Sequence, residues 1–329
     1  MNKPFVEFKN LKTYFHTNKG VVKSVNDVSF EIKKGETVGI VGESGCGKSV
    51  TALSLMRLLP SPQGKIEGGD ILFEGNSILS MSEKELRKIR GNDISMIFQE
   101  PMTSLNPALT IGKQISEGII LHQKTSKSEA QKKAIEMIKL VDIPRPDEIY
   151  NSYPHELSGG MRQRIMIAIA LSCNPKLLIA DEPTTALDVT IQSQILQLMK
   201  DIKDKFNTSI MLITHDLGVV AEMCDKVVVM YAGKVVEIGS VLDIFKNPKH
   251  PYTKGLLKSK PSLLQSSNKL YSIPGQVPNP IEIPECCYFS DRCEKSFDRC
   301  KSSIPSLKTL ENNQKVACWI YEGDNNVKS

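Results

Sequence analysis

The feature that most constrains this sequence is the glycine-rich segment at residues 42–49, which reads GESGCGKS and fits the pattern G-x-x-x-x-G-K-S/T. The apolar residues 37–41 before it predict a buried strand, and residues 52–56 after it are compatible with a helix. In this context the glycines let backbone N–H groups surround a polyphosphate, at the positive end of the helix. A plain glycine-rich turn is the alternative, but the complete pattern favours a nucleotide-binding P-loop, with Lys48 on the β- and γ-phosphates and Ser49 on Mg²⁺.

The composition is that of an ordinary globular protein, since 40% of the 329 residues are hydrophobic and 24% are charged, and the length allows about two domains. The net charge of +5 is modest and the basic residues are scattered, which argues against nucleic acid as the main partner. No apolar stretch approaches the ~18–20 residues that cross a bilayer, and residues 1–4 lack a signal-peptide core. We therefore expect a cytoplasmic chain without direct membrane insertion, which reaches a membrane only through a partner.

Residues 5–41 alternate between apolar and polar side chains, with breaks at residues 18–20 and 34–35. A period of two predicts antiparallel strands that lead into the strand before the P-loop. Phe15, next to Tyr14, lies upstream of the P-loop, where an aromatic ring could stack on adenine or simply pack in the core. The residues alone leave both interpretations open.

Three predicted buried strands end in polar side chains: Gln99, the adjacent Asp181 and Glu182, and His215. The carboxyl ends of strands in an α/β sheet border the ligand crevice. One carboxylate could hold Mg²⁺ while the other takes a proton from an attacking water, and the histidine could bond a γ-phosphate. The ordinary alternatives are a surface glutamine, two surface acids and a structural histidine.

Residues 105–175 are mostly helical in pattern, and two helix starts are visible. Ser126 and Glu129 have the spacing of a capping box. Residues 157–164 read LSGGMRQR and precede an apolar run, so Ser-Gly-Gly opens a buried helix. That start is either a second anion-binding helix N-terminus or a flexible N-cap. The apolar stripe within residues 191–206 follows helical spacing and is interpreted as core.

The chain changes character after residue 246, where prolines are frequent and periodicity is weak, which predicts an extended or looped segment. Five cysteines lie there: Cys286, Cys287, Cys293, Cys300 and Cys318. A cytosolic setting argues against structural disulfides, and the lack of a C-x2-C pair argues against a zinc ribbon. The thiols could hold an iron–sulfur cluster or a zinc ion, or remain free, and their spacing does not choose between these.

The chain resembles the ATP-binding subunit of an ABC transporter in five features that follow one another in the expected order. These are the P-loop, Gln99, the Leu-Ser-Gly-Gly of residues 157–160, the Asp181–Glu182 pair and His215. The resemblance covers residues 5 to about 245, and Leu-Ser-Gly-Gly is its most specific part, because other P-loop ATPases and GTPases lack it. Three further features are similar to the oligopeptide/dipeptide importer branch: QEPMTSLNP at residues 99–107, HPYT at residues 250–253 and the cysteine-rich tail.

The resemblance implies an α/β fold, namely a P-loop NTPase with a RecA-like parallel core sheet, an antiparallel β subdomain and a helical signature subdomain at about residues 100–165. A small, loop-rich C-terminal extension follows. We therefore expect an ATP-binding domain at residues 1–245 and the C-terminal extension at residues 246–329.

The resemblance also implies how individual residues bind and hydrolyse ATP. Phe15 is expected to stack on adenine, and the phosphates are expected to contact Gly42, Ser44, Gly45, Cys46, Gly47, Lys48 and Ser49. Mg²⁺ is expected at Ser49, Gln99 and, through water, Asp181. The expected catalytic set is Glu182 as general base, His215 on the γ-phosphate and the attacking water, Gln99 and Lys48. Ser158 and Gly160 are expected to complete the ATP site of a second subunit, with Asp188 at the dimer seam, although Asp188 could instead be a helix cap.

Some members of this branch carry a 4Fe–4S cluster on four cysteines of the extension. The resemblance therefore implies such a cluster on Cys287, Cys293, Cys300 and Cys318, while Cys286 has no implied role. A structural role for this centre is favoured over a redox or iron sensor that gates the ATPase.

The implied function is ATP hydrolysis that powers di- or oligopeptide import, with two ATP molecules joining two ATPase subunits and hydrolysis reopening them. The implied partners are two transmembrane permease subunits, a second ATP-binding subunit (a paralogue or a second copy) and, through the permease, an extracytoplasmic solute-binding protein. The implied location is the cytoplasmic face of the membrane. A nickel or other small-solute importer is the main alternative. An ABC ATPase acting on nucleic acid is disfavoured, because the sequence has no coiled-coil insertion and no second P-loop.

Overall fold

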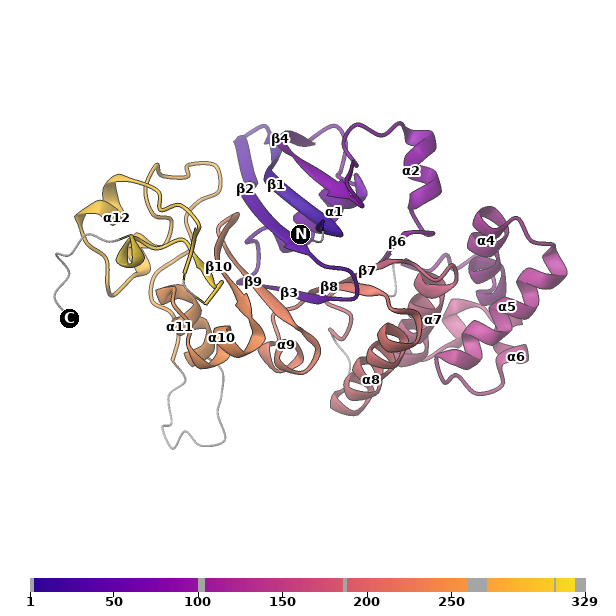
Figure 1. The fold of residues 1–329 in the computed structure, drawn as a ribbon. Coiled ribbons are helices and arrows are strands. Elements are labelled where there is room, and N and C mark those ends of the chain that lie inside the picture. The colour runs from indigo at the N-terminus through magenta and orange to yellow at the C-terminus, as the bar shows by residue number, and fades with distance from the viewer. Residues whose placement is uncertain (1–2, 100–103, 186–187, 260–270, 311, 323–329) are drawn as a thin grey trace. The chain divides into compact units, whose positions relative to one another are not determined.

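The computed structural model describes residues 3–99, 104–185, 188–259, 271–310 and 312–322 of the chain (Figure 1). The motif residues 100–103 and 186–187 lie outside this described part. Two compact units share the chain: unit 1 contains Met1–Glu31, Val38–Leu79 and Thr214–Ser329, and unit 2 contains Ile32–Thr37 and Ser80–Ile213. The units alternate along the sequence, and the predicted domain boundary at residue 245 stays a prediction.

Unit 1 contains an antiparallel sheet of strand order β2-β1-β4-β5, as the period of two predicts. Its strands are β1 (Val6–Thr17), β2 (Gly20–Ile32), β4 (Gly64–Phe73) and β5 (Asn76–Ser77). Val6 and Phe8 alternate with exposed or half-buried residues, and the Phe8 ring stacks on Phe30 with 4.3 Å between the ring centroids. One face of this sheet therefore belongs to the hydrophobic core.

A second group of strands in unit 1 leads into the P-loop. Strand β3 (Thr37–Val41) pairs in parallel with β9 (Lys226–Tyr231), and all five residues of β3 are buried. Beyond β9 follow the antiparallel strands β10 (Lys234–Ser240), β12 (Lys315–Val316) and β11 (Lys308–Thr309). Strands β11 and β12 come from the C-terminal extension, so the extension continues the sheet instead of forming only loops.

The helices of unit 1 are short. They are α1 (Lys48–Met56), α9 (Leu217–Met223), α10 (Val241–Lys246), α11 (Pro251–Lys258) and α12 (Asp298–Ser302). Helix α11 begins at the HPYT motif, where His250 is the N-cap and Pro251 occupies the first turn, a position that needs no N–H donor.

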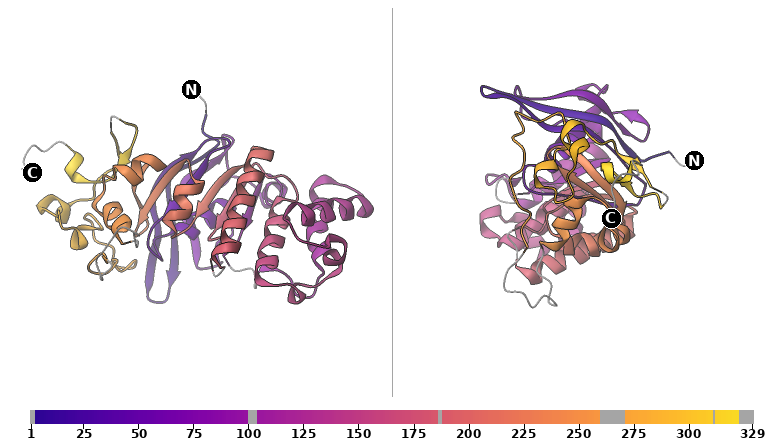
Figure 2. Two further views of the ribbon diagram at one scale, coloured as in Figure 1. Left: turned by 90° about the horizontal axis from the view of Figure 1, so that it is seen from below. Right: turned by 90° about the vertical axis from the view of Figure 1, so that its left-hand side faces the viewer.

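Unit 2 combines a three-stranded parallel group with a helical layer. The strands, in the order β8-β7-β6, are β6 (Ile94–Ile97), β7 (Leu177–Asp181) and β8 (Ser209–Ile213). The helices are α2 (Glu83–Ile89), α4 (Ile111–Gln123), α5 (Lys127–Leu140), α6 (Pro146–Asn151), α7 (Gly159–Leu171) and α8 (Val189–Phe206). Helices α4, α5 and α6 lie together (Figure 2), which confirms a mostly helical region between β6 and β7.

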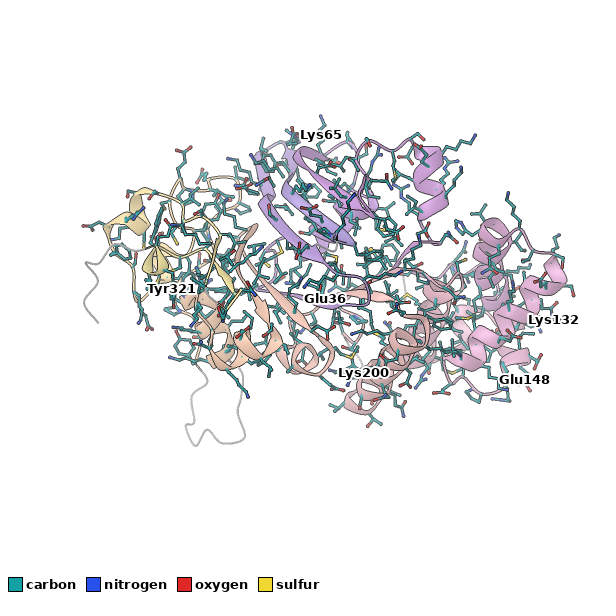
Figure 3. All side chains as sticks on the ribbon, in the orientation of Figure 1. Glu36, Lys65, Lys132, Glu148, Lys200 and Tyr321 are labelled. Atoms are coloured by element: carbon teal, nitrogen blue, oxygen red, sulfur yellow. The ribbon has the colours of Figure 1, made fainter. Side chains whose placement is uncertain are left out.

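Local sequence signals explain where these helices begin and which faces they bury. The Ser126 hydroxyl accepts a hydrogen bond from the Glu129 N–H at 3.2 Å, so α5 starts where the capping pattern predicts. Lys132 of α5 and Glu148 of α6 are exposed and point away from the helical layer (Figure 3). Within the described residues, none of the helices combines the length and apolar composition needed to cross a bilayer.

Candidate active site

The loop between β3 and α1 is shaped by three glycines in left-handed conformations, with φ of 154° at Gly42, 78° at Gly45 and 98° at Gly47. A side chain at Gly42 would place its Cβ 2.2 Å from the carbonyl oxygen of Met230, and one at Gly47 would place it 2.3 Å from that of Ser24. Apart from Gly45 and its two chain neighbours, no described residue has an atom within 4 Å of the same point at Gly45. Close packing therefore requires Gly42 and Gly47, whereas Gly45 borders open space in which loop N–H groups can approach a phosphate.

Lys48 is the first residue of α1, and its side chain lies inside this loop. It is 7% exposed, and its ammonium donates hydrogen bonds to the carbonyl oxygens of Gly42 at 2.8 Å and Glu43 at 3.1 Å. The positive charge is thus placed where the N–H groups of the loop and the start of α1 already favour an anion.

The other P-loop side chains differ in how they could serve a nucleotide. Ser44 is exposed and Ser49 is half-buried on the first turn of α1, so both hydroxyls are near the surface of the loop. The Cys46 side chain is buried, and this burial raises the pKa of its thiol. Cys46 therefore offers a nucleotide only its backbone.

Phe15 is half-buried on β1, in the same unit as the P-loop. Its neighbour Tyr14 points to the other face of the strand and donates a hydrogen bond from its hydroxyl to Asn26 Oδ1 at 2.8 Å. The two rings therefore lie on opposite faces of β1, and stacking of Phe15 on adenine stays a prediction.

Two side chains of the C-terminal extension contact the P-loop, and the sequence analysis assigned neither to the nucleotide site. Arg292 makes two hydrogen bonds with the Glu43 carboxylate, and the Tyr252 hydroxyl accepts one from the Glu43 N–H at 2.9 Å. These partners are 249 and 209 residues apart in the chain. No short stretch of sequence predicts such a contact. The only feature of the sequence that pointed to this region was the HPYT motif, which contains Tyr252.

In unit 2, the polar residues at the ends of β6 and β7 come together. Asp181 is the last residue of β7 and is 5% exposed, and Glu182 follows it with a left-handed φ of 49°. The Glu182 Oε2 atom accepts hydrogen bonds from Gln99 Nε2 at 3.1 Å and from the Thr185 hydroxyl at 2.9 Å. The structure therefore unites the predicted Gln99 and Glu182, and adds Thr185. A glutamate in left-handed backbone is uncommon, and such conformations gather at functional sites.

His215 follows β8 and belongs to unit 1, as does the P-loop. It is exposed, and it directly precedes Asp216, the N-cap of α9, whose Oδ1 accepts from the Gly218 N–H at 2.8 Å. The short helix thus fixes the backbone next to His215 and leaves its imidazole accessible.

The predicted signature segment forms the start of α7. Ser158 is the N-cap, and its hydroxyl accepts a hydrogen bond from the Met161 N–H at 3.3 Å. At Gly160 a Cβ would lie 3.2 Å from Ile191 Cγ2, so the glycine allows a close approach to α8. Gln163, which is 3% exposed, donates to the Pro183 carbonyl oxygen at 2.6 Å and ties the signature helix to the residue after Glu182. The sequence analysis missed this tie.

Asp188 is the N-cap of α8, because its carboxylate accepts a hydrogen bond from the Ile191 N–H at 3.0 Å. The helix-cap interpretation of Asp188 is therefore confirmed. A role at a dimer seam stays a prediction.

The four cysteines of the predicted cluster line one small cavity of about 10 Å³, together with His250, Phe289 and Trp319. Burial raises the pKa of the Cys287 thiol to about 12 and that of Cys318 to about 11, and it also raises the pKa of Cys293. All eight cysteines are free of disulfide bonds in the structure. Among the described residues, however, no three His, Cys, Asp or Glu side chains are placed so that they already form a metal-binding group.

Comparison with known proteins shows two family matches. Residues 25–185 match the ABC transporter family, and residues 236–300 match the C-terminal region of the oligopeptide/dipeptide transporter family. The chain is 56% identical to the oligopeptide transport ATP-binding protein AppD of Bacillus subtilis, over 96% of this chain and 97% of that protein. It is 52% identical to the dipeptide transport ATP-binding protein DppD of the same organism, over 95% and 94%.

A solved structure supports the fold independently. The dimeric structure of a post-hydrolysis state of an ATP-binding cassette, bound to ADP and phosphate, superposes with a TM-score of 0.65 at 29% sequence identity. The match covers 72% of this chain and 98% of that cassette. The predicted α/β cassette fold is therefore confirmed.

Proposed function

The chain belongs to the ATP-hydrolysing cassettes of the ABC transporter family, in the group with the oligopeptide/dipeptide transporter C-terminal region, and we propose that it powers the import of di- and oligopeptides. One observation carries the proposal. The similarity to proteins named for oligopeptide and dipeptide transport extends over nearly the whole chain, including the extension.

Each unit by itself contains residues to which we assign a role in ATP binding or hydrolysis. In unit 1 the loop N–H groups and Lys48 hold the phosphates, Ser49 offers a hydroxyl to Mg²⁺, and His215 holds the γ-phosphate. In unit 2 Gln99 and Asp181 offer oxygen donors to Mg²⁺, and Glu182 is the general base. Hydroxyl, amide and carboxylate oxygens are the donors that Mg²⁺ prefers, so the donors of each unit have the chemistry that suits the ion. When bound, Mg²⁺ neutralises charge on the phosphates.

Ser158 and Gly160 are proposed to complete the ATP site of a second ATP-binding subunit, with Asp188 near the seam. The exposed Ser158 at a capped helix N-terminus supports this, since such an end attracts a phosphate. ATP then favours the closed pair of subunits because it binds that state more tightly than the open one. Two transmembrane permease subunits would hold the chain at the cytoplasmic face of the membrane, and a solute-binding protein would deliver peptides to them.

We also propose that Cys287, Cys293, Cys300 and Cys318 hold a 4Fe–4S cluster. The chemistry of the donor set fits, because four thiolates are the usual ligands of such a cluster and the four thiols line one cavity in the extension. Binding would have to draw the thiols together, since no three of the described side chains already form a metal-binding group. Binding must release the thiol protons, since burial holds these pKa values high. Chain purified without oxygen should be brown, with about four irons per chain; a colourless protein with one zinc would refute the cluster.

Uptake of labelled peptides tests the transport function. Cells that lack the gene, and cells that carry only Glu182→Gln, should lose uptake of a labelled di- or oligopeptide and keep uptake of labelled nickel. Loss of nickel uptake alone would overturn the substrate and leave the ATPase assignment intact.

A further inference from the structure

Glu43 lies within the P-loop, and its carboxylate, its N–H and its carbonyl oxygen each make hydrogen bonds. Its carboxylate accepts hydrogen bonds from Arg292, with Nη1–Oε2 at 2.7 Å and Nη2–Oε1 at 3.0 Å. Its N–H donates to the Tyr252 hydroxyl at 2.9 Å, and its carbonyl oxygen accepts from Lys48 Nζ at 3.1 Å. Two of these three partners, Arg292 and Tyr252, belong to the C-terminal extension.

Arg292 is fixed by other groups as well, so it can act as a rigid partner for Glu43. It is 8% exposed, its Nε donates to the Pro274 carbonyl oxygen at 2.9 Å, and its Nη1 lies 3.3 Å from the Tyr231 hydroxyl. The rings of Tyr231 and Phe289 lie 5.6 and 5.9 Å from the guanidinium carbon. A planar fork of donors held in this way orients a carboxylate better than a flexible ammonium can.

The charge of Glu43 explains why its position matters. An unneutralised carboxylate in a phosphate-binding loop would repel the phosphates. Arg292 neutralises this carboxylate with two short, charge-assisted hydrogen bonds. Counting side-chain atoms alone, Arg292 is 6% exposed and Glu43 is 27% exposed. The pair is therefore partly shielded from water and salt.

We propose that Arg292 and Tyr252 are positioning residues for ATP binding. Through Glu43 they set the charge and the backbone geometry of the P-loop, so the C-terminal extension tunes the affinity of the chain for ATP. The inference rests on the proposed role of residues 42–49 in holding the phosphates. Both residues act through Glu43, and neither is assigned a catalytic role.

Equilibrium binding of a fluorescent ATP analogue to the full-length chain tests the inference. Arg292→Ala should weaken binding about tenfold, because it removes both charge-assisted hydrogen bonds that neutralise the Glu43 carboxylate. The double variant Arg292→Ala with Glu43→Gln should recover most of that loss, because the unneutralised carboxylate is gone. Added salt should shrink the defect of the single variant and leave the double variant nearly unchanged.

Two further variants separate positioning from general stabilisation. Arg299 of the same extension stacks on Trp319, with 3.8 Å from the guanidinium carbon to the ring centroid, and lies 3.8 Å from Glu322. Arg299→Ala should lower the melting temperature and leave ATP binding unchanged. Tyr252→Phe removes a neutral hydrogen bond and should weaken binding about threefold, independently of salt.

The outcomes decide between the alternatives. The inference is overturned if folded Arg292→Ala binds the ATP analogue with an affinity within about twofold of that of the unmodified chain. It is also overturned if the double variant binds the analogue no better than Arg292→Ala alone. If Arg292→Ala does not fold, Arg292→Gln decides, since it removes the positive charge and keeps a side chain that can donate a hydrogen bond; unchanged ATP binding would overturn the inference. If the unmodified chain binds no better than Lys48→Ala, the proposed nucleotide site itself is wrong, and the inference fails with it.

Discussion

Replacing Glu182 by Gln tests the catalytic assignment most directly, because the structure separates the chemical role of this side chain from its structural one. A glutamine oxygen can still accept the hydrogen bonds that Glu182 receives from Gln99 and Thr185. The fold, the left-handed backbone at residue 182 and ATP binding should therefore persist. What is lost is the capacity to take a proton.

The expected magnitude follows from comparing these two roles. A positioned general base contributes about 10²–10⁴ in rate, or about 3–5 kcal/mol of the barrier. Losing one hydrogen bond to a charged carboxylate at an exposed site costs about 1.5 kcal/mol, the lower end of the range for such bonds, which corresponds to roughly tenfold. Glu182→Gln should thus slow hydrolysis at least a hundredfold, whereas Thr185→Val, which removes only the 2.9 Å contact, should slow it no more than about tenfold.

The assay is single-turnover ATP hydrolysis by the transporter purified from cells that carry each variant, with size-exclusion chromatography in ATP. Glu182→Gln should accumulate as an ATP-bound pair of subunits. Hydrolysis by this variant within about tenfold of the unmodified rate would refute Glu182 as the base. An equal loss in Thr185→Val would show that geometry, and not proton transfer, limits the step.

Four further substitutions test the packing of the P-loop, of the signature helix and of the C-terminal extension. Gly42→Ala should unfold the loop and abolish ATP binding, because its Cβ would overlap the carbonyl oxygen of Met230 at 2.2 Å. Gly45→Ala should fold with only about 1 kcal/mol of strain, because its Cβ would meet open space. Urea unfolding and ATP binding measure both effects. Gln163→Ala leaves the Pro183 carbonyl oxygen without its 2.6 Å donor, and we expect a loss of about 1–3 kcal/mol in urea unfolding together with slower hydrolysis. The carboxylate of Glu237 is fully buried and accepts hydrogen bonds from the Lys249 N–H at 2.6 Å, from Gln314 Nε2 at 2.7 Å and from the His250 N–H at 2.9 Å. Glu237→Ala should therefore lower the free energy of unfolding by about 3 kcal/mol or more and increase proteolysis of the extension. Unchanged proteolysis would show that Glu237 does not anchor the extension.

Local sequence determined much of this protein. The glycine pattern of residues 42–49, the buried run that ends at Asp181 and the Ser158 helix cap each depend on backbone geometry and neighbours a few residues away. Such features can be predicted because their physical causes are contained within one turn or one strand. The antiparallel strands before the P-loop were predictable for the same reason, since their alternating burial follows a period of two.

Only the tertiary structure decided which distant groups meet. Gln99 and Glu182 were each predicted, but their 3.1 Å contact depends on β6 and β7 being neighbours in the sheet. The hydrogen bonds between Arg292 and Glu43 join residues that are 249 positions apart in the chain. The four cysteines share a cavity because the extension folds back and pairs its strand β12 with β10. Burial and charge pairing between remote residues depend on how whole elements pack, and no short window of sequence records that packing.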